Sequence, residues 1–505
     1  MSSFRTQQNT GSSTYVIELE DRGTSKTQTP NKPSPPQSVY SLGRRETPRA
    51  SHDHDEDRQE TLPSPTTHVA DQVQKWNYPR INVGRTMGMF LSFVVMGLND
   101  GAYGAVIPYL ETYYHLTYTV VSLIFLSPLV GYTLSALLNN SIHLKFGQRG
   151  VALIGPTCHL IAFTVISVHP PWPVMIVIFM FAGFGNGLMD AGWNAWVGAL
   201  ANPNEVLGFL HGFYGVGATL GPLIATTMIT KANWPWYYFF YFMIAISAVE
   251  LILLSTTFWG ATSAVFRAAN ARTSEAKGSR MKEALLTQPS ARVTWICAFF
   301  FLGYVGVEVA LGGWIVTFMM RERDGDPFAS GMTATGFWLG ITVGRFVLGF
   351  ITPRLGEKLA ITIYLPLAMA LELLFWLVPQ FYVSAVAVAL QGFFLGPLFP
   401  VAVVVATKLL PKHLHVSAIG FAAAFGGGGA AIFPFAVGAI AQAKGVQVLQ
   451  PIVLAILGAI LALWMGLPRM GGKREDEEPK GFWGRVRESG DVVGMIRRRR
   501  GAVDT

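Results

Sequence analysis

The chain has 505 residues, of which 51% are hydrophobic and only 13% are charged, and its mean hydropathy is +0.38. Soluble domains carry about 25% charged residues, so this composition excludes an ordinary soluble protein and favours an integral membrane protein. The formal net charge of +8 follows from the basic residues of the membrane loops, described below, and gives no reason to expect a nucleic-acid partner.

Both ends of the chain differ in composition from its middle. Residues 1–85 are rich in proline, serine, threonine and mixed charge, with little apolar surface to bury, and we predict a disordered cytosolic tail there. It contains no apolar core of a signal peptide, so the first membrane span is expected to be the first anchor. Residues 468–505 are polar and carry four consecutive arginines, Arg497 to Arg500. We interpret them as a basic cytosolic tail, with binding to anionic lipid as the alternative.

Between the tails, apolar stretches of about 20 residues, long enough to cross a bilayer, recur along the chain. Their continuous apolar character favours helices, because the strands of a membrane barrel alternate apolar and polar residues. We therefore predict an all-α integral membrane protein with twelve transmembrane helices. The predicted spans are 86–108, 117–139, 150–168, 173–200, 205–230, 236–259, 292–320, 331–352, 359–379, 382–409, 414–440 and 446–467.

The basic residues of the loops support this even number of spans. With the N-terminus inside, the inside loops carry twelve lysines and arginines and the outside loops carry four, in agreement with the positive-inside rule. Both termini are therefore expected in the cytosol. The two cysteines, Cys158 and Cys297, lie within predicted spans and suggest neither a disulfide framework nor a metal site.

Three internal similarities relate the first six spans to the last six. The loops NSIHLKFGQRG and GFITPRLGEKL share a glycine between basic residues, 209 residues apart. FYGVGATLGP and FGGGGAAIFP end in prolines 212 residues apart, and Asp100 and Glu308, each followed four residues later by glycine, are 208 apart. Such near-equal offsets predict two homologous, pseudo-symmetric halves. The predicted organisation is a half at 86–260, a basic cytosolic linker loop at 261–291 and a half at 292–467.

These features resemble the major facilitator superfamily over the predicted spans. The two loops are similar to its cytoplasmic glycine-and-basic motif, although Leu144 and Pro353 stand where an aspartate is usual. Within the superfamily the chain resembles the fucose–proton symporter branch and its eukaryotic relatives. GLND in the first span carries this likeness, as does GFGNGLMDAGWNAWV in the fourth, where Asp190 takes the position of that branch's acidic residue. The resemblance implies a proton-coupled carrier whose halves give alternating access to a central site.

Three carboxylic acids, Asp100, Asp190 and Glu308, lie near the middle of predicted spans. An acid there costs about 2.5–3.5 kcal/mol on insertion scales, so it is expected to face the bundle interior or a wet cavity. Enclosed in a cavity that opens to alternate sides, such a group can take up and release an ion. We predict that these three residues carry the coupling ion, a proton, with sodium as the alternative.

The fourth span also suggests the substrate class. Asn186, Asp190 and Asn194 recur every four residues and so share one helix face. Amide, carboxylate and indole groups suit a hydroxyl-rich ligand such as a sugar, because polar groups hold hydroxyls while a ring covers an apolar face. Each residue has an alternative interpretation, as an interhelical hydrogen bond or as core packing. The predicted substrate contacts are Asn99, Asn186, Trp193, Asn194, Tyr304, Trp314 and Gln391.

The direction of transport is judged from the fourth and fifth spans. The fifth is similar to the glycine–proline motif of superfamily antiporters, but Ala225 and Thr226 replace its final glycine pair. The fourth has no arginine where drug antiporters usually carry one. We therefore expect proton-coupled uptake, with proton-coupled export of a small metabolite or drug as the alternative. A non-transporting nutrient sensor would keep the same site.

Enzymatic activity is not expected, because the chain contains neither an HExxH nor a GxSxG motif. We expect no cofactor and no metal. The expected partners are a small-molecule substrate, a proton or sodium ion and the lipid bilayer, and the protein is expected to be a monomer. The plasma membrane is expected rather than a vacuolar or other internal membrane.

Overall fold

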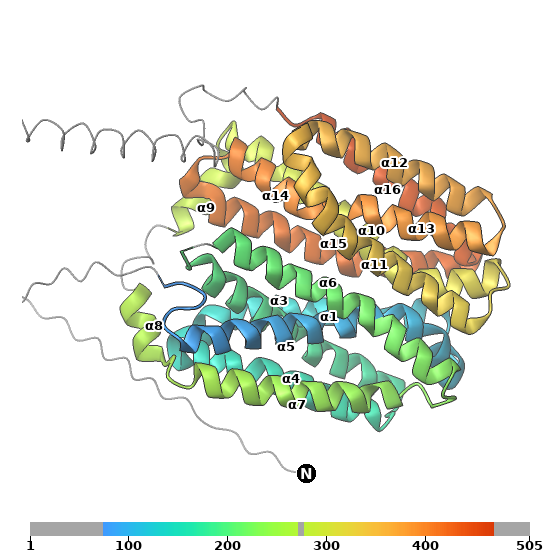
Figure 1. Ribbon diagram of the computed structural model, residues 1–505, viewed down its shortest axis with the longest axis horizontal. Helices are drawn as coiled ribbons and strands as arrows, with labels where there is room; N and C mark the ends of the chain where they lie inside the picture. The colour runs from blue at the N-terminus through green and yellow to red at the C-terminus, as the bar shows by residue number, and fades with distance from the viewer. Residues whose placement is uncertain (1–73, 202, 271–276, 469–505) are drawn as a thin grey trace, which may run out of the picture. The chain divides into compact units, whose positions relative to one another are not determined.

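The computed structural model describes residues 74–201, 203–270 and 277–468. These residues form helices and contain no strand (Figure 1). The first half contains α1 (Ile81–Tyr114), α2 (Tyr118–Val121), α3 (Leu123–Phe146), α4 (Gln148–Ser167), α5 (Trp172–Gly198), α6 (Pro203–Thr230) and α7 (Tyr238–Phe258). Two short helices follow, α8 (Ser263–Asn270) and α9 (Lys277–Leu286). The second half contains α10 (Ser290–Glu322), α11 (Pro327–Leu355), α12 (Glu357–Leu377), α13 (Phe381–Leu395), α14 (Leu398–Leu409), α15 (His415–Lys444) and α16 (Leu449–Met465), with 3-10 turns at Lys412–Leu414 and Val446–Val448.

Twelve segments of the described chain are long and apolar enough to cross a membrane, which confirms the predicted number. Two of them consist of more than one α-helix. The second span joins α2 to α3, and the tenth, predicted as one helix over 382–409, is divided into α13 and α14 at Gly396 and Pro397. The division follows from Pro397 and Pro400, which lack the N–H groups that a continuous helix needs.

The first helix begins five residues earlier than predicted, at Ile81. Its first turn is polar, but the polar groups have partners. Asn82 Nδ2 donates to the carbonyl oxygen of Lys75 at 3.0 Å, and Arg85 Nε donates to the carbonyl oxygen of Thr257 at 3.1 Å. The helix therefore extends beyond its apolar run, into the predicted tail. The remainder of both predicted tails, 1–73 and 469–505, lies outside the described residues.

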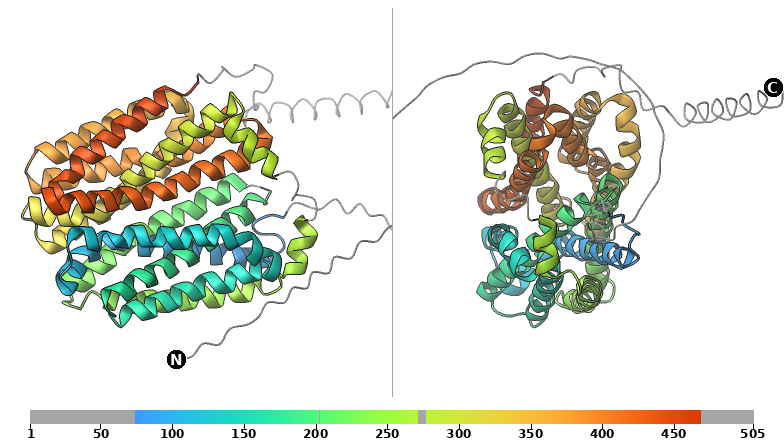
Figure 2. Two further views of the ribbon diagram at one scale, coloured as in Figure 1. Left: turned by 180° about the vertical axis from the view of Figure 1, so that it is seen from behind. Right: turned by 90° about the vertical axis from the view of Figure 1, so that its left-hand side faces the viewer.

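The linker 261–291, predicted as a loop, contains α8 and α9. Helix α8 contacts α3 and α4 of the first half, whereas α9 contacts α10 and α15 of the second. Figure 2 shows the blue-to-green helices of the first half below the orange-to-red helices of the second, with α9 among the latter. The two described parts of the predicted linker are therefore helical and each packs on one half, while residues 271–276 lie outside the described residues.

Corresponding helices pack alike in the two halves. Helices α1 and α6 pair in the first, as α10 and α15 do in the second. Gly147 ends α3 with φ +72° and Gly356 ends α11 with φ +84°, a left-handed conformation that glycine adopts without steric cost. The positive φ angle at both positions accounts for the glycine that the two basic loops share. The cysteines lie apart, on α4 and α10, each 3% exposed and unpaired.

The halves meet closely where α1 crosses α10. A Cβ atom added to Gly104 would lie 2.1 Å from the carbonyl oxygen of Gly312, so only glycine permits this approach. Further contacts join the halves beyond this crossing, toward the C-terminal ends of both helices. Glu111 and Arg321 form an ion pair at 3.9 Å, and the Tyr118 backbone N–H donates to Gln442 Oε1 at 2.8 Å. We call this the Glu111 end of the bundle.

Candidate functional site

Asp100 lies on α1, one turn before Gly104, and is only partly buried. Its Oδ1 accepts a hydrogen bond from Asn99 Nδ2 at 3.0 Å, and its Oδ2 accepts one from the Tyr214 hydroxyl of α6 at 3.1 Å. Asn99 Nδ2 also donates to the Tyr103 hydroxyl at 2.7 Å. The carboxylate is therefore held between α1 and α6, with polar partners and some access to its surroundings.

Asp190 lies on α5 and belongs to a second group. The four-residue spacing places Asn194 beside it, and Asn194 Nδ2 donates to Asp190 Oδ1 at 2.8 Å. His211 of α6 then lies with its Nε2 3.2 Å from Asn194 Oδ1. Carboxylate, amide and imidazole thus form a continuous line from α5 to α6.

Glu308, on α10 in the second half, is 5% exposed and pairs with Arg345 of α11, whose Nη2 lies 2.9 Å from Glu308 Oε1. Arg345 lies ten residues before the C-terminal end of α11. Its Nε donates to the carbonyl oxygen of Gly396 at 3.3 Å. That oxygen is available because Pro400, four residues later, has no N–H to offer. Tyr304, one turn before Glu308, is fully buried beside the pair, and its hydroxyl interacts with both Glu308 and Arg345.

The three groups approach one another between the halves. Asp100 and Asp190 are within electrostatic range of each other, as are Tyr214 and Glu308. The Phe399 ring of α14 lies between the groups, with centroid distances of 6.5 Å to His211 and 6.5 Å to Tyr304. We call this set the interface cluster; it comprises Asn99, Asp100, Asp190, Asn194, His211, Tyr214, Tyr304, Glu308, Arg345 and Phe399. It contains all three predicted acids.

Comparison with known proteins identifies the family. The model of the Major Facilitator Superfamily matches residues 89–368 and 295–501. The chain belongs to this superfamily. It is 30% identical over 413 residues to Bypass of stop codon protein 6 of Saccharomyces cerevisiae, a match that covers 76% of this chain and 82% of the yeast protein. It is 24% identical over 350 residues to the Glucose/mannose transporter GlcP of Bacillus subtilis, covering 68% and 85%.

Among solved structures, the crystal structure of a D-xylose–proton symporter superposes with a TM-score of 0.62 at 15% sequence identity, covering 77% of this chain and all but 1% of the symporter chain. At this identity the likeness concerns the fold. Family membership and the twelve spans make the protein an integral, multi-pass membrane transporter, as the sequence predicts.

Other residues predicted to bind substrate lie outside the interface cluster. Trp193 is 0% exposed and stacks on Phe258 of α7, with ring centroids 4.8 Å apart. Trp314 donates from Nε1 to the carbonyl oxygen of Pro434 at 2.9 Å. Its ring also packs between the halves near the Glu111 end, with centroid distances of 5.9 Å to Tyr118 and 6.3 Å to Phe125. Periodicity gave no means of telling that Trp193 packs inside one half whereas Trp314 packs between the halves.

The two predicted amides Asn186 and Gln391 also lie within the halves. Asn186 hydrogen-bonds to His159 of α4, and Gln391 Nε2 donates to Glu372 Oε2 at 2.8 Å. Glu372 is 0% exposed. Sequence reasoning overlooked it, although a carboxylic acid within an apolar span was the signal that identified Asp100. No group of three or more His, Cys, Asp or Glu residues suited to a metal ion occurs in the described part of the chain.

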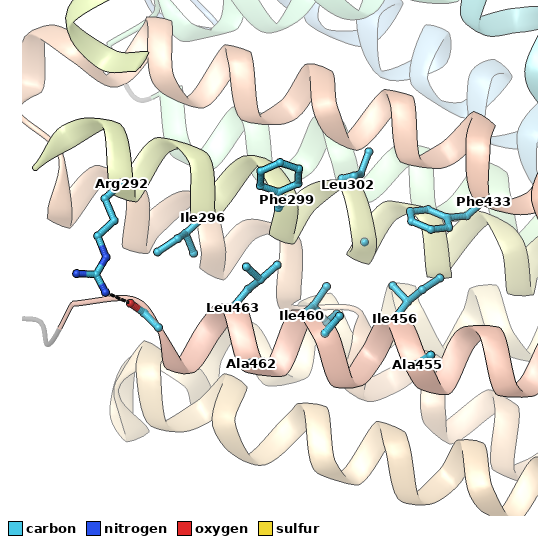
Figure 3. Close-up of a pocket in the computed structure, with 13 residues that line it drawn as sticks. Arg292, Ile296, Phe299, Leu302, Phe433, Ala455, Ile456, Ile460, Ala462 and Leu463 are labelled. Atoms are coloured by element: carbon cyan, nitrogen blue, oxygen red, sulfur yellow. Dashed lines mark hydrogen bonds between the residues drawn. The ribbon is translucent and has the colours of Figure 1, made fainter. Parts of the chain in front are cut away.

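The transporter also has an apolar groove on the second half, and Figure 3 shows its lining. Arg292 lies at one end of the groove and donates to the carbonyl oxygen of Gly466 at 3.2 Å. All lining residues belong to α10, α15, α16 and the turn after α16, so the groove is separate from the interface cluster. The remaining lining residues are Ile296, Phe299, Leu302, Gly303, Phe433, Ala455, Ile456, Ala459, Ile460, Ala462 and Leu463.

Removal of Arg345 is expected to destabilise the protein. Arg345→Ala leaves the Glu308 carboxylate without its partner, and breaking a buried ion pair on one side costs about 3–5 kcal/mol. The measurement is the thermal unfolding midpoint of the purified protein in detergent. The double variant Arg345→Ala/Glu308→Ala should recover most of the loss, because no unpaired charge then remains. An unchanged midpoint in the single variant contradicts a structural role for this pair.

Trp193→Phe tests where the indole acts. Phenylalanine keeps an aromatic ring against Phe258, so we expect an unchanged KM for transport and a loss of stability of about 1 kcal/mol or less. Uptake kinetics of the variant in proteoliposomes provide the measurement. An increase in KM without loss of stability would show that the Trp193 indole binds substrate.

Proposed function

We propose that the protein is a proton-coupled symporter that carries a sugar by alternating access of the interface cluster to the two sides of the membrane. The observation that carries this proposal is the meeting of Asp100, Asp190 and Glu308, from both halves, at one place between them. A carboxylic acid within a membrane span costs free energy, so such acids typically have polar partners or line a pathway for substrate or ions. Here two of them, Asp100 and Asp190, keep partial exposure.

The three groups suit different tasks. Asp100 has hydroxyl and amide partners but no basic residue bonded to it, so it is free to exchange a proton. Asp190, Asn194 and His211 offer both donors and acceptors, which matches the hydroxyl groups of a sugar. Phe399 supplies an aromatic face for its apolar side.

The Glu308–Arg345 pair suits a conformational role. Arg345 binds Glu308 of α10 and the free carbonyl at the division between α13 and α14. A change of charge at Glu308 would therefore act on α10, α11 and the tenth span together. We assign to Glu308 the coupling of ion binding to movement of the second half. Our proposal does not include Trp193, Trp314 and Gln391 among the substrate contacts.

The similarity to a glucose/mannose transporter supports a sugar as substrate. The Glu111 end is placed outside the cell, because the basic loops then face the cytosol. In this orientation the halves are joined at the extracellular end, through Glu111, Arg321, Tyr118 and Gln442. We further propose that both termini are cytosolic and that the protein takes up its substrate across the plasma membrane.

Proteoliposomes containing the purified protein provide the test. Radiolabelled D-glucose, D-mannose and D-xylose serve as probes, with an inwardly directed proton gradient. We expect at least one sugar to accumulate above equilibrium and the accumulation to collapse on addition of a protonophore. Accumulation driven by a sodium gradient alone identifies the other ion, and sugar release driven by inward proton flow identifies an exporter. Saturable binding of a sugar without flux under any gradient contradicts transport and favours a sensor.

A further inference from the structure

A second charged group lies inside the first half, away from the interface cluster. His159 of α4 and Glu250 of α7 form an ion pair, with His159 Nδ1 3.1 Å from Glu250 Oε2. His159 is 1% exposed and Glu250 is 0% exposed. Ser92 of α1 donates to the second carboxylate oxygen, Glu250 Oε1, and Asn186 of α5 contacts the other ring nitrogen. Four helices of the half thus converge on one pair.

The hydrogen bonds define the state of the imidazole. Nδ1 faces a carboxylate oxygen and Nε2 faces the amide oxygen of Asn186, Oδ1. Both oxygens can accept hydrogen bonds, and this arrangement suits an imidazolium ion that donates from both ring nitrogens. When the proton leaves Nε2, the Asn186 amide must turn so that its Nδ2–H donates to the bare nitrogen. The pair therefore has two hydrogen-bonded states that differ by one proton.

The surroundings contain few other groups that titrate. Helix α7 presents Glu250, and α1 presents Ser92 and, at longer range, Asp100, which interacts electrostatically with His159. Helix α5 presents Asn186, which does not titrate. Among the main electrostatic interactions of His159, Asp100 is the one acid of the interface cluster. A change of charge at His159 therefore acts on Asp100.

A mechanical connection accompanies the electrostatic one. Asn186 is one helical turn before Asp190 on α5, and Asp190 is one turn before Asn194. A rotation of the Asn186 amide thus occurs on the same helix face that carries the Asp190–Asn194–His211 line. Ser92 lies two turns before Asp100 on α1. Both helices that bear first-half acids of the cluster also touch the His159–Glu250 pair.

We propose that His159 and Glu250 form a second proton-holding site, which gains and loses one proton in each transport cycle and is coupled to the interface cluster through Asn186 and Asp100. This inference rests on the proposed function, since it assigns to proton-coupled transport a pair that lies outside the cluster. His159 and Glu250 act as positioning residues toward Asp100 and Asp190 and do not contact substrate.

The second half supplies a matched control. Glu372 of α12 is as deeply buried as Glu250, but it is hydrogen-bonded to Gln391 in place of a histidine. One carboxylate oxygen, Glu372 Oε1, has no partner. Without an imidazole this site has no second proton-binding partner, so Glu372→Gln is expected to preserve coupling.

The experiment separates coupling from translocation. The wild type is reconstituted in proteoliposomes alongside three variants, His159→Gln, Glu250→Gln and Glu372→Gln. The probe is a labelled sugar that the wild type accumulates, and its uptake is measured in two modes. In the first, a proton gradient drives net accumulation. In the second, counterflow exchanges labelled for unlabelled sugar at equal pH on both sides, which requires alternation of the site but no net proton movement. Proton movement is recorded in parallel with a pH-sensitive dye.

We expect His159→Gln and Glu250→Gln to lose sugar-dependent proton uptake and accumulation while counterflow persists. Glu372→Gln should match the wild type in both modes. Full accumulation and proton uptake in His159→Gln overturns the inference and leaves the symport proposal intact. Loss of counterflow together with accumulation in His159→Gln overturns it also, because the role is then structural. Absence of proton-driven uptake in the wild type overturns the proposed function itself.

A further variant keeps the test decisive if a single substitution prevents folding. His159→Gln/Glu250→Gln removes both charges together and retains hydrogen-bonding side chains, and replacing both members of a buried pair is often tolerated. The same split between accumulation and counterflow is expected for it. Monodisperse elution on size-exclusion chromatography establishes that each variant compared is folded. A double variant that accumulates sugar like the wild type overturns the inference.

Discussion

Asp100→Asn should abolish proton-driven sugar accumulation while counterflow continues. Asparagine keeps an oxygen that accepts from Tyr214, so the contact between α1 and α6 survives, but it binds no proton. Removal of a group that transfers a proton typically lowers a rate by about 100-fold or more, and we expect coupled uptake to fall at least that far. The measurement is uptake of labelled sugar with and without an imposed proton gradient, with counterflow at equal pH as the internal control.

Asp190→Asn is tested separately, because either acid can carry the coupling ion. At least one of the two variants should bind sugar and exchange it without proton movement. Tyr214→Phe is a useful companion, since it removes a hydrogen bond to Asp100 and leaves the carboxylate in place; we expect it to reduce coupled uptake less than Asp100→Asn. Undiminished coupled flux in both acid variants would remove Asp100 and Asp190 from the mechanism.

Gly104→Ala should impair transport through sterics alone. The added Cβ would lie 2.1 Å from the carbonyl oxygen of Gly312, and backbone cannot yield as a flexible side chain does. Helices α1 and α10 must therefore move apart. The conformation in which the two halves touch at the Glu111 end then becomes less stable. Overpacking costs about 1–3 kcal/mol, which corresponds to roughly a 5- to 150-fold shift between two conformations.

Gly208→Ala is the matched control for this substitution. Gly208 lies on α6, and a Cβ added there meets no heavy atom within 4 Å. Both variants change glycine to alanine in a helix, so intrinsic helix propensity affects them alike. We expect wild-type uptake from Gly208→Ala and a slower turnover, with normal folding, from Gly104→Ala. Equal uptake rates in the two would show that the α1–α10 approach does not limit the transport cycle.

Much of the fold could be predicted because apolar length is a strong signal in a membrane protein. All twelve spans were found, and the glycine shared by the two basic loops has a positive φ angle in both. The predicted start of the first helix was wrong because polar groups before the apolar run have hydrogen-bond partners. Asn82 and Arg85 are bonded within their surroundings, so α1 begins before its apolar run. The division of the tenth span depends on the combined effect of two prolines.

The site was predictable for the acids and less so for the residues around them. A carboxylic acid within a span must face the interior, so composition identifies it. An indole such as Trp193 packs favourably on any side of a helix, and sequence does not reveal its partner Phe258. Glu250 carried the same signal as Asp100, an acid in an apolar run, and that rule applied to every span would have found it. Its pairing with His159 depends on the packing of α4 against α7, which sequence periodicity does not determine.

The two native cysteines offer a practical route to watching the transporter move. Cys158 and Cys297 are each 3% exposed, so maleimide and nitroxide reagents should bypass them and react with thiols introduced at the surface. Spin labels at positions 111 and 321, on opposite halves, would begin close together, given the 3.9 Å separation of the native Glu111 and Arg321 side chains. Pulsed electron resonance should then record a longer distance whenever the Glu111 end opens.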